Sequence, residues 1–288
     1  MTGPRIVPVQ GRRHTVYFQE FAARQRAVFL DTEVDMARVE AHREAARDAS
    51  GRTFSRVSYV LFAVGRVLAE YPAANAVMAP GWPSRWRAPR VARYDGVTAK
   101  LALDRELQGE RSVLSALVPG VERAGLAEIQ QRVDRYRGPG TDQLPEFAGV
   151  RKLVRLPVPL GRLAFGLAMR DLARREQVFG TVSVSSLGHG QVDGFHSVGG
   201  TALTVNLGRV VDRPVVRDGA VAVVPVMRLN LAFDHRVVDG ALASDVLGAL
   251  KQQLEEFDDR SGAEPVGAAV RTADQDRRPG RALAPDRR

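Results

Sequence analysis

The sequence has no cysteine among its 288 residues. This absence excludes disulfide bonds, thiolate nucleophiles, iron–sulfur clusters and zinc sites built from cysteine. Any covalent chemistry must therefore use serine, threonine, lysine, aspartate, glutamate or histidine side chains. We expect no metal cofactor.

Lysine is also scarce, although the chain is basic. The formal net charge is +9, yet only three of the 42 basic residues are lysine, at Lys100, Lys152 and Lys251. The arginines are spread along the chain, which indicates a compositional bias more than a nucleic-acid-binding stripe, although a basic surface would attract phosphate groups. The stretch Trp82–Arg93 interleaves arginines with two tryptophans, so nucleic-acid binding stays open as a minor alternative, but we do not expect nucleic acid as a partner.

Long hydrophobic runs are missing as well. The longest, Val57–Ala69, is interrupted by Arg66 and is shorter than the roughly 20 apolar residues that cross a bilayer. The N-terminus has no apolar stretch typical of a signal peptide. With 44% hydrophobic residues, the chain can still bury a full core. We expect a soluble, cytoplasmic protein with no membrane partner.

The hydrophobic pattern predicts one α+β domain over residues 1–258. Strands are expected at residues 28–36, 180–186, 202–211 and 220–233. Helices are expected over 37–47, 55–72 (largely buried), 125–137 (solvent-facing) and from Gly240 onward (amphipathic). The stretch Val154–Arg175 is predicted to form one apolar helix edged by arginines, and Gly81–Arg93 a loop. Residues 259–288 are rich in proline, glycine, alanine and arginine without periodicity, and we expect this tail to be disordered.

A histidine follows the strand predicted at 220–233 and precedes an aspartate by four residues. Continuing the period-two alternation of the strand points His235 towards its apolar side. A neutral imidazole at a strand end suits general-base catalysis near pH 7. Asp239 would cap the next helix, which Gly240 can begin without a clash. From this pattern alone, a structural core histidine and a catalytic base are equally supported.

The stretch LAFDHRVVDGA resembles the signature of the catalytic domain of dihydrolipoamide acyltransferases, the core subunits of 2-oxo acid dehydrogenase complexes, and of the related chloramphenicol acetyltransferases. Four other stretches are similar to this family in the same order: VFLDTEVDMARVEAHREA, SYVLFAVGRVLAEYPAANAVM, GTVSVSSLGHGQVDGF and LGRVVDRPVV. Together they cover most of residues 12–257. The resemblance implies a two-layer, chloramphenicol acetyltransferase-like α+β fold, with a mixed sheet packed by helices and an active site between the subunits of a homotrimer.

The resemblance also implies a mechanism. The chain would transfer an acyl group from acyl coenzyme A, with acetyl-CoA as the expected donor, and without a covalent acyl-enzyme. His235 would remove a proton from the acceptor thiol or hydroxyl as it attacks the thioester. Ser185, by its position in VSVSSLG, would hydrogen-bond the tetrahedral oxyanion, and Ser186 is the nearest alternative. The sequence identifies no residue that binds the donor.

Structural support for the histidine loop is also implied by the resemblance. Asp239 is mainly structural in this family and ion-paired to an arginine of the N-terminal segment. Arg12 and Arg13 are the candidate partners in this chain. Gly240 is expected to support the same turn.

The sequence departs from the dehydrogenase core subunits at several points. Its core pattern starts almost at the N-terminus, and no lysine lies in an Asp-Lys-Ala turn, so we expect no covalently bound lipoyl group. The tail is polar and arginine-rich where the family's cubic cores use an apolar anchor. The stretch Val154–Arg175 is expected to be an insertion, and it resembles the RLP helix of free-standing actinobacterial-type relatives found in small-molecule pathways.

These departures favour a free-standing acyltransferase of natural-product biosynthesis. Its acceptor would be a small-molecule hydroxyl, as in the tetronate-type acetyltransferases, or an intermediate bound to a carrier protein. One alternative is a dihydrolipoamide acyltransferase whose lipoyl domain is a separate protein. Another is a non-catalytic trimeric scaffold, against which the presence of both His235 and Ser185 argues.

Overall fold

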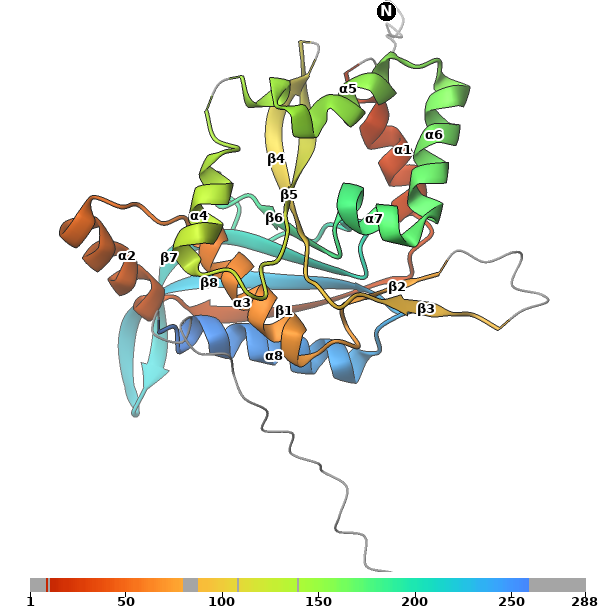
Figure 1. Cartoon of the computed structure of the whole chain (residues 1–288). Helices are drawn as coiled ribbons and strands as arrows, with labels where there is room; N and C mark the ends of the chain where they lie inside the picture. The colour runs from red at the N-terminus through yellow and green to blue at the C-terminus, as the bar shows by residue number, and fades with distance from the viewer. Residues whose placement is uncertain (1–8, 10, 80–87, 108, 139, 259–288) are drawn as a thin grey trace, which may run out of the picture.

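The computed structural model describes residues 9, 11–79, 88–107, 109–138 and 140–258. Its centre is a six-stranded mixed sheet with the strand order β1-β8-β7-β6-β4-β5 (Figure 1). The strands are β1 (Ala27–Asp35), β4 (Ala99–Leu107), β5 (Glu110–Val118), β6 (Val182–Ser186), β7 (Leu203–Arg217) and β8 (Ala220–Asp234). Strand β6 runs parallel to both of its neighbours, and the other pairs are antiparallel. A separate hairpin pairs β2 (Ala76–Met78) with β3 (Val91–Arg93).

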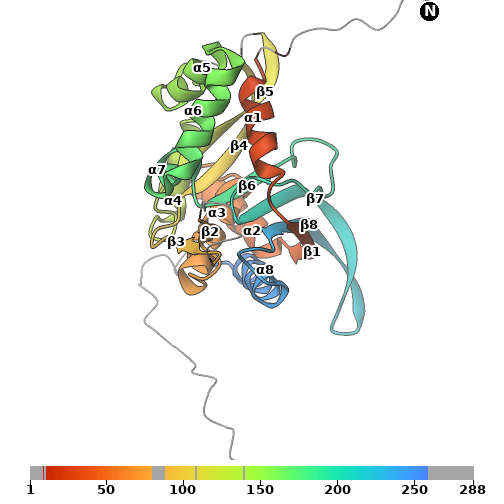
Figure 2. The ribbon, with the colours of Figure 1, turned by 90° about the vertical axis from the view of Figure 1, so that its right-hand side faces the viewer.

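Helices cover both faces of the sheet (Figure 2). On one face lie α2 (Ala37–Ser50), α3 (Arg56–Glu70) and α8 (Gly240–Glu255). On the other lie α1 (Arg13–Ala22), α5 (Ala148–Arg155), α6 (Val158–Arg170) and α7 (Leu172–Phe179). Helix α4 (Leu126–Asp134) packs against α3 and β5, and two short 3-10 turns, Thr141–Gln143 and Pro145–Phe147, lead into α5. Among the described residues, no helix is both long and apolar enough to span a bilayer.

The main core lies between the sheet and the helices α3 and α8. Leu229, Leu231 and Phe233 of β8 are at most 2% exposed and belong to this core. Helix α3 is buried along most of its length, and the Ser55 hydroxyl caps it by accepting a hydrogen bond from the Ser58 N–H. The alternation read from the sequence of β8 therefore places its apolar residues as predicted.

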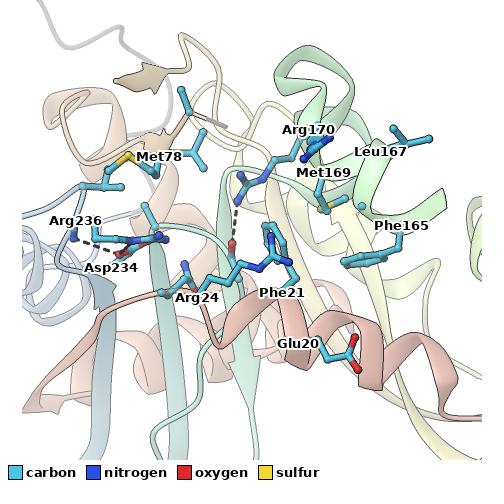
Figure 3. Close-up of a pocket in the computed structure, with 18 of the residues that line it drawn as sticks. Glu20, Phe21, Arg24, Met78, Phe165, Leu167, Met169, Arg170, Asp234 and Arg236 are labelled. Carbon is cyan, nitrogen blue, oxygen red and sulfur yellow. Dashed lines mark hydrogen bonds and ion pairs between the residues drawn. The ribbon is translucent and has the colours of Figure 1, made fainter. Parts of the chain in front are cut away.

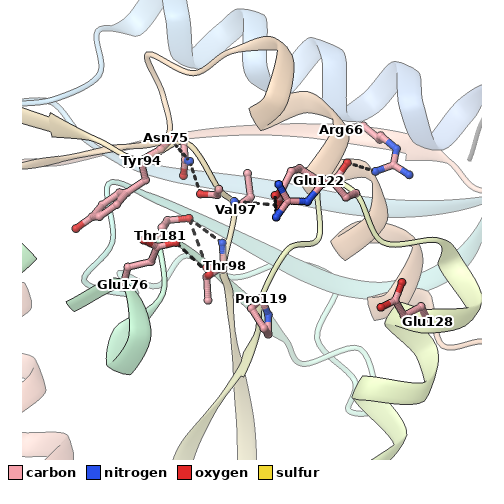
Figure 4. Close-up of polar contacts among 12 residues, drawn as sticks. Arg66, Asn75, Tyr94, Val97, Thr98, Pro119, Glu122, Glu128, Glu176 and Thr181 are labelled. Atoms are coloured by element: carbon pink, nitrogen blue, oxygen red, sulfur yellow. Dashed lines mark hydrogen bonds and ion pairs between the residues drawn. The ribbon is translucent and has the colours of Figure 1, made fainter. Parts of the chain in front are cut away.

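Polar contacts fix the chain where it enters β4 (Figure 4). The buried Asn75 amide donates to the carbonyl oxygens of Tyr94 and Gly96 at 2.8 Å each. The Glu122 carboxylate accepts from the Val97 N–H at 3.0 Å, and Thr181 Oγ1 accepts from the Thr98 N–H at 3.2 Å. These bonds satisfy backbone groups outside the strands, and they tie the segment before β4 to the turn after α3, the loop after β5 and the residue before β6.

The predicted α+β class and the mixed sheet packed with helices are confirmed, but three local predictions are wrong. The stretch Val154–Arg175 is not one helix: Pro157 and Asp171 divide it between α5, α6 and α7. The strand predicted to end at 211 continues to Arg217, because its far half pairs with β8 as a hairpin. The helix over 125–137 is not simply solvent-facing, since Leu126, Ile129 and Val133 are buried.

Two further predictions concern segments without a structural description. Residues 80–87, which hold both tryptophans, lie outside the described residues, and β3 occupies the end of the predicted loop. The tail 259–288 also lies outside the described residues, so its disorder stays a prediction.

Candidate active site

The turn that carries His235 is held from both sides. The Asp234 carboxylate accepts hydrogen bonds from the Arg236 guanidinium at 2.6 and 2.9 Å and from the Arg26 N–H at 3.3 Å. The His235 N–H donates to the Arg26 carbonyl at 2.9 Å. Burial alone would raise the pKa of Asp234, but the hydrogen bonds from Arg236 and Arg26 outweigh it and lower that pKa. Asp234 is therefore a carboxylate at neutral pH and anchors the turn.

His235 itself is exposed in the single chain. Strand β8 ends at Asp234, so the alternation stops one residue before the histidine. Its ring keeps one apolar neighbour, Phe233, with 5.5 Å between the ring centroids. The interpretation of His235 as a buried core histidine is wrong, because a core side chain would be covered on all sides.

Of the expectations for the supporting residues, the helix cap by Asp239 is present in the structure and its ion pair with an N-terminal arginine is not, among the described residues. The Asp239 side chain accepts from the Leu242 N–H at 2.8 Å and caps α8, which confirms the helix-cap interpretation. The predicted ion pair is absent among the described residues of the single chain: the Arg13 guanidinium donates to backbone carbonyls at the end of α5, and Arg12 has no ion pair. Gly240 begins α8, but an added Cβ there would meet nothing within 4 Å, so space does not require glycine.

Ser185 lies near the end of β6, on the sheet face opposite the main core. It shares this face with the buried Ser183 and is itself half-buried. In the sheet register Ser185 pairs with Asn206, and Asn206 pairs with Asn230. His235 directly follows β8, five residues beyond Asn230, and β8 is two strands away from β6. At standard strand spacings the two residues are therefore roughly 19 Å apart. One chain therefore does not bring its own His235 and Ser185 together.

A large cavity opens on the same face, beside the histidine turn (Figure 3). Its volume is about 1150 Å³, and it lies between α1, α6, the start of α7, the hairpin β2-β3 and the end of β8. Asp234, Arg236 and Val237 line it, whereas the His235 side chain between them does not. The histidine turn is thus one wall of the cavity.

A buried lysine is the next feature of this sheet face. Lys100 on β4 is 5% exposed, and its ammonium group donates to the Gly199 carbonyl and lies 3.6 Å from the centre of the Phe179 ring. Burial, together with the nearby Arg175 charge, lowers the pKa of Lys100 to about 7. An amine with this pKa is partly neutral at physiological pH, which is unusual for lysine.

Neither Lys100 nor the arginines of the cavity stand out in the sequence. Arginine is so frequent in the chain that no single position is distinctive, and the residues around Lys100 match no lysine motif. Its strand pattern places it on the face of Ser183, its partner in the β4-β6 register, which was the one available hint. Within the described part of the chain, no group of three or more acidic or histidine side chains could hold a metal ion.

The fold and part of the sequence are similar to those of known acyltransferases. Residues 154–260 match the family described as 2-oxoacid dehydrogenases acyltransferase (catalytic domain). The fold resembles a probable dihydrolipoamide acetyltransferase from Listeria monocytogenes 4b F2365, with a TM-score of 0.64, 19% identity and coverage of 88% of this chain and 95% of that one. It equally resembles the cubic core of the pyruvate dehydrogenase multienzyme complex, with a TM-score of 0.64, 18% identity and coverage of 90% and 94%. The predicted resemblance to this family, and its fold, are confirmed.

Curated relatives point in the same direction. The chain is 25% identical over 271 residues to the lipoamide acyltransferase component of the branched-chain alpha-keto acid dehydrogenase complex from Pseudomonas putida, covering 88% of this chain and 53% of the relative. It is 40% identical over 52 residues to the acetyltransferase component of the pyruvate dehydrogenase complex from Bacillus subtilis (strain 168), covering 18% and 12%. The match thus spans about half the length of the first relative and about an eighth of the length of the second.

The family match corrects one prediction. It begins at Val154, so α6 and the segment predicted as an insertion align with the family's catalytic domain instead of interrupting it.

Proposed function

We propose that the chain is an acyltransferase that moves an acyl group from coenzyme A to a thiol or hydroxyl acceptor, at a site shared between subunits of a homotrimer. His235 of one subunit acts as the general base, and Ser185 of the partner subunit stabilises the oxyanion. The observation that carries this proposal is the separation of these two residues in one chain, combined with the family match that spans both. A base and an oxyanion donor roughly 19 Å apart cannot act on one carbonyl group.

The chemistry follows from the residue types. The imidazole of His235 takes the acceptor proton as the acceptor sulfur or oxygen attacks the thioester carbonyl. The Ser185 hydroxyl donates a hydrogen bond to the resulting oxyanion. When the carbon–sulfur bond breaks, the imidazolium returns the proton to the coenzyme A thiolate, so the base is restored without an acyl-enzyme.

The turn geometry supports this role for His235. Its backbone is fixed by Arg26, its preceding residue is tied to Arg236, and the helix after it is capped by Asp239. The imidazole is left exposed at the end of a rigid turn, where a neighbouring subunit can complete the site. One structural relative is described as a cubic core, which supports self-association of this fold.

Two acceptors are supported by different observations. Dihydrolipoamide is favoured by the relatives, which are components of 2-oxo acid dehydrogenase complexes. A small-molecule hydroxyl, free or on a carrier protein, is favoured by the cavity beside the histidine turn, whose volume of about 1150 Å³ accommodates an organic acceptor. Natural-product biosynthesis would follow from the second acceptor.

The test is release of free coenzyme A from acetyl-CoA, measured by thiol titration with dihydrolipoamide and with a panel of hydroxylated acceptors. We expect acceptor-dependent release, and we expect His235→Ala to lower kcat by roughly 10²- to 10⁴-fold. His189→Ala, at an exposed histidine after β6, is the matched control and should leave the rate unchanged. Full activity in His235→Ala would refute the general base. Turnover of dihydrolipoamide alone would refute the small-molecule acceptor.

A further inference from the structure

The cavity beside the histidine turn is strongly cationic. Among the described residues, six arginines line it against two carboxylates, Glu20 and Asp234. Both carboxylates are already engaged, Glu20 with Arg162 at 2.6 Å and Asp234 with Arg236 at 2.6 Å. The remaining four arginines are Arg24, Arg90, Arg170 and Arg175. None of these four forms an ion pair with a carboxylate among the described residues.

Arg175 is the buried member of this set. Its side chain comes from α7 and is 6% exposed, and its guanidinium donates to the Gly200 carbonyl at 3.0 Å and lies 5.0 Å from the Phe21 ring centre. Lys100 lies near the same Phe179 ring as Arg175, and it is also buried and also without a carboxylate partner among the described residues. Arg175 is thus a buried cation that feels the nearby Asp234 charge without forming an ion pair with it, and Lys100 beside it is only partly charged; an anion in the adjoining cavity would stabilise the charged form of both.

The rest of the lining is apolar. Phe21 of α1 packs edge-on against Phe165 of α6, with 6.0 Å between the ring centroids (Figure 3). Leu163, Leu167 and Met169 of α6 also line the cavity. Leu163 and Leu167 are more than half exposed, at 58% and 56%, so this part of α6 is uncovered in the single chain. Apolar walls bind an apolar body, and a few charged groups orient it.

We propose that this cavity binds the acyl acceptor, and that the acceptor is an amphiphilic anion: an apolar chain or ring bearing a carboxylate or an equally acidic oxygen. The anion lies between Arg24, Arg170 and Arg175, and the apolar body lies along α6. The acceptor assignment rests on the proposed acyl transfer, whereas the anion site itself does not. A coenzyme A phosphate group is the other source of negative charge, but the apolar walls fit it poorly.

Binding of simple probes tests the site without catalysis. Isothermal titration should show that decanoate binds at least tenfold more tightly than decanol, which has the same chain length but no charge. Arg24→Gln and Arg170→Gln should each weaken decanoate binding at least tenfold and leave decanol binding unchanged. The control is Arg174→Gln, at an exposed arginine of α7 that does not line the cavity. Both variant positions are exposed, so the variants should fold normally.

Three results would overturn the proposal. Equal affinities for decanoate and decanol would show that the cavity has no anion site. The same conclusion would follow if the Arg24→Gln and Arg170→Gln proteins bound decanoate as tightly as the Arg174→Gln control. Displacement of decanoate by coenzyme A would assign the cavity to the donor.

Measuring acyl transfer distinguishes failure of the anion site from failure of the proposed function. With acetyl-CoA as donor, 10-hydroxydecanoate should have a kcat/KM at least tenfold above that of 1,10-decanediol, and Arg170→Gln should abolish this preference. Charge-dependent binding with no transfer to any acceptor would overturn the acceptor assignment and the proposed function, while the anion site would remain.

Discussion

The two faces of the central sheet carry different chemistry, although the same strands build both. On the face towards α3 and α8, the side chains of β8 are apolar and pack into the main core. On the opposite face most of the buried side chains are polar: Lys100, Ser183, Thr204, Asn206, Asn230 and Asp234. Burying polar groups stabilises a fold less than burying apolar ones does. The comparison teaches that the first face maintains the fold and that the second is available for binding and catalysis.

The largest stability effect is expected on the apolar face. Leu231→Ala removes a fully buried side chain from β8 and should lower the free energy of unfolding by about 2–5 kcal/mol. Val223→Ala is the control on the same strand, where the side chain is 72% exposed and the change should stay within about 0.5 kcal/mol. Urea unfolding measures both. Equal losses would contradict the assignment of the core to this face.

A change on the polar face should instead reduce activity. Ser185→Ala should lower kcat by about 10²- to 10³-fold, equivalent to about 2.7–4 kcal/mol of transition-state stabilisation, with little change in unfolding. Ser186→Ala is the matched control. It removes the hydroxyl of the adjacent residue, which accepts a hydrogen bond from the Gly188 N–H. Steady-state kinetics on both variants decides between them. If Ser186→Ala were the inactive one, the assigned oxyanion donor would be wrong.

The buried lysine makes stability depend on pH. The pKa of Lys100 falls from 10.5 in a free side chain to about 7 in the fold, so the unfolded chain binds one more proton between these values. Unfolding therefore becomes harder as pH rises through this window, by at most about 1.4 kcal/mol per pH unit. Urea unfolding at pH 7 and 9 should show this rise in the native protein. It should be lost in Lys100→Met and kept in Lys152→Met, at an exposed lysine of α5. If the free energy of unfolding changed with pH in the same way in all three proteins, Lys100 would not be the source of the pH dependence.

The smallest effect is expected at the cap of α8. Asp239→Ala should lower the melting temperature through a loss of about 0.5–2 kcal/mol, because the Leu242 N–H loses its acceptor. Asp239→Asn keeps the capping oxygen and should melt close to the native protein. If Asn destabilises as much as Ala, the negative charge matters, and the ion pair with an N-terminal arginine would be formed in the assembled protein.

The fold was largely predictable because its strands and helices have strong local patterns. The apolar body of α3, its Ser55 cap and the alternation of β8 each identify their element from sequence alone. The break of Val154–Arg175 at Asp171 was missed, because Asp171 caps α7 through its side chain and the residues on both sides favour a helix. At Asp171 the capping side chain favours a break and the flanking residues favour a continuous helix, so tertiary packing decides whether the helix is divided.

The candidate site was predictable only in part. His235 and Ser185 were identified through motifs that resemble a family, and the cap by Asp239 follows from residue type. Their separation in one chain depends on strand order and register, which the sequence does not reveal. The cavity could not be predicted, since Arg24 lies in the turn after α1, Arg170 ends α6 and Arg175 belongs to α7, so the three meet only in the folded chain.

The central claim is that the base and the oxyanion donor of one site come from different chains. The most direct test mixes the two inactive variants, His235→Ala and Ser185→Ala, unfolds them together and refolds them. In random mixed trimers, roughly a quarter of the sites combine an intact His235 from one chain with an intact Ser185 from the next, so roughly a quarter of the native activity should return. The same variants refolded separately and then mixed should stay inactive. No recovery after joint refolding into normal oligomers would contradict a shared site.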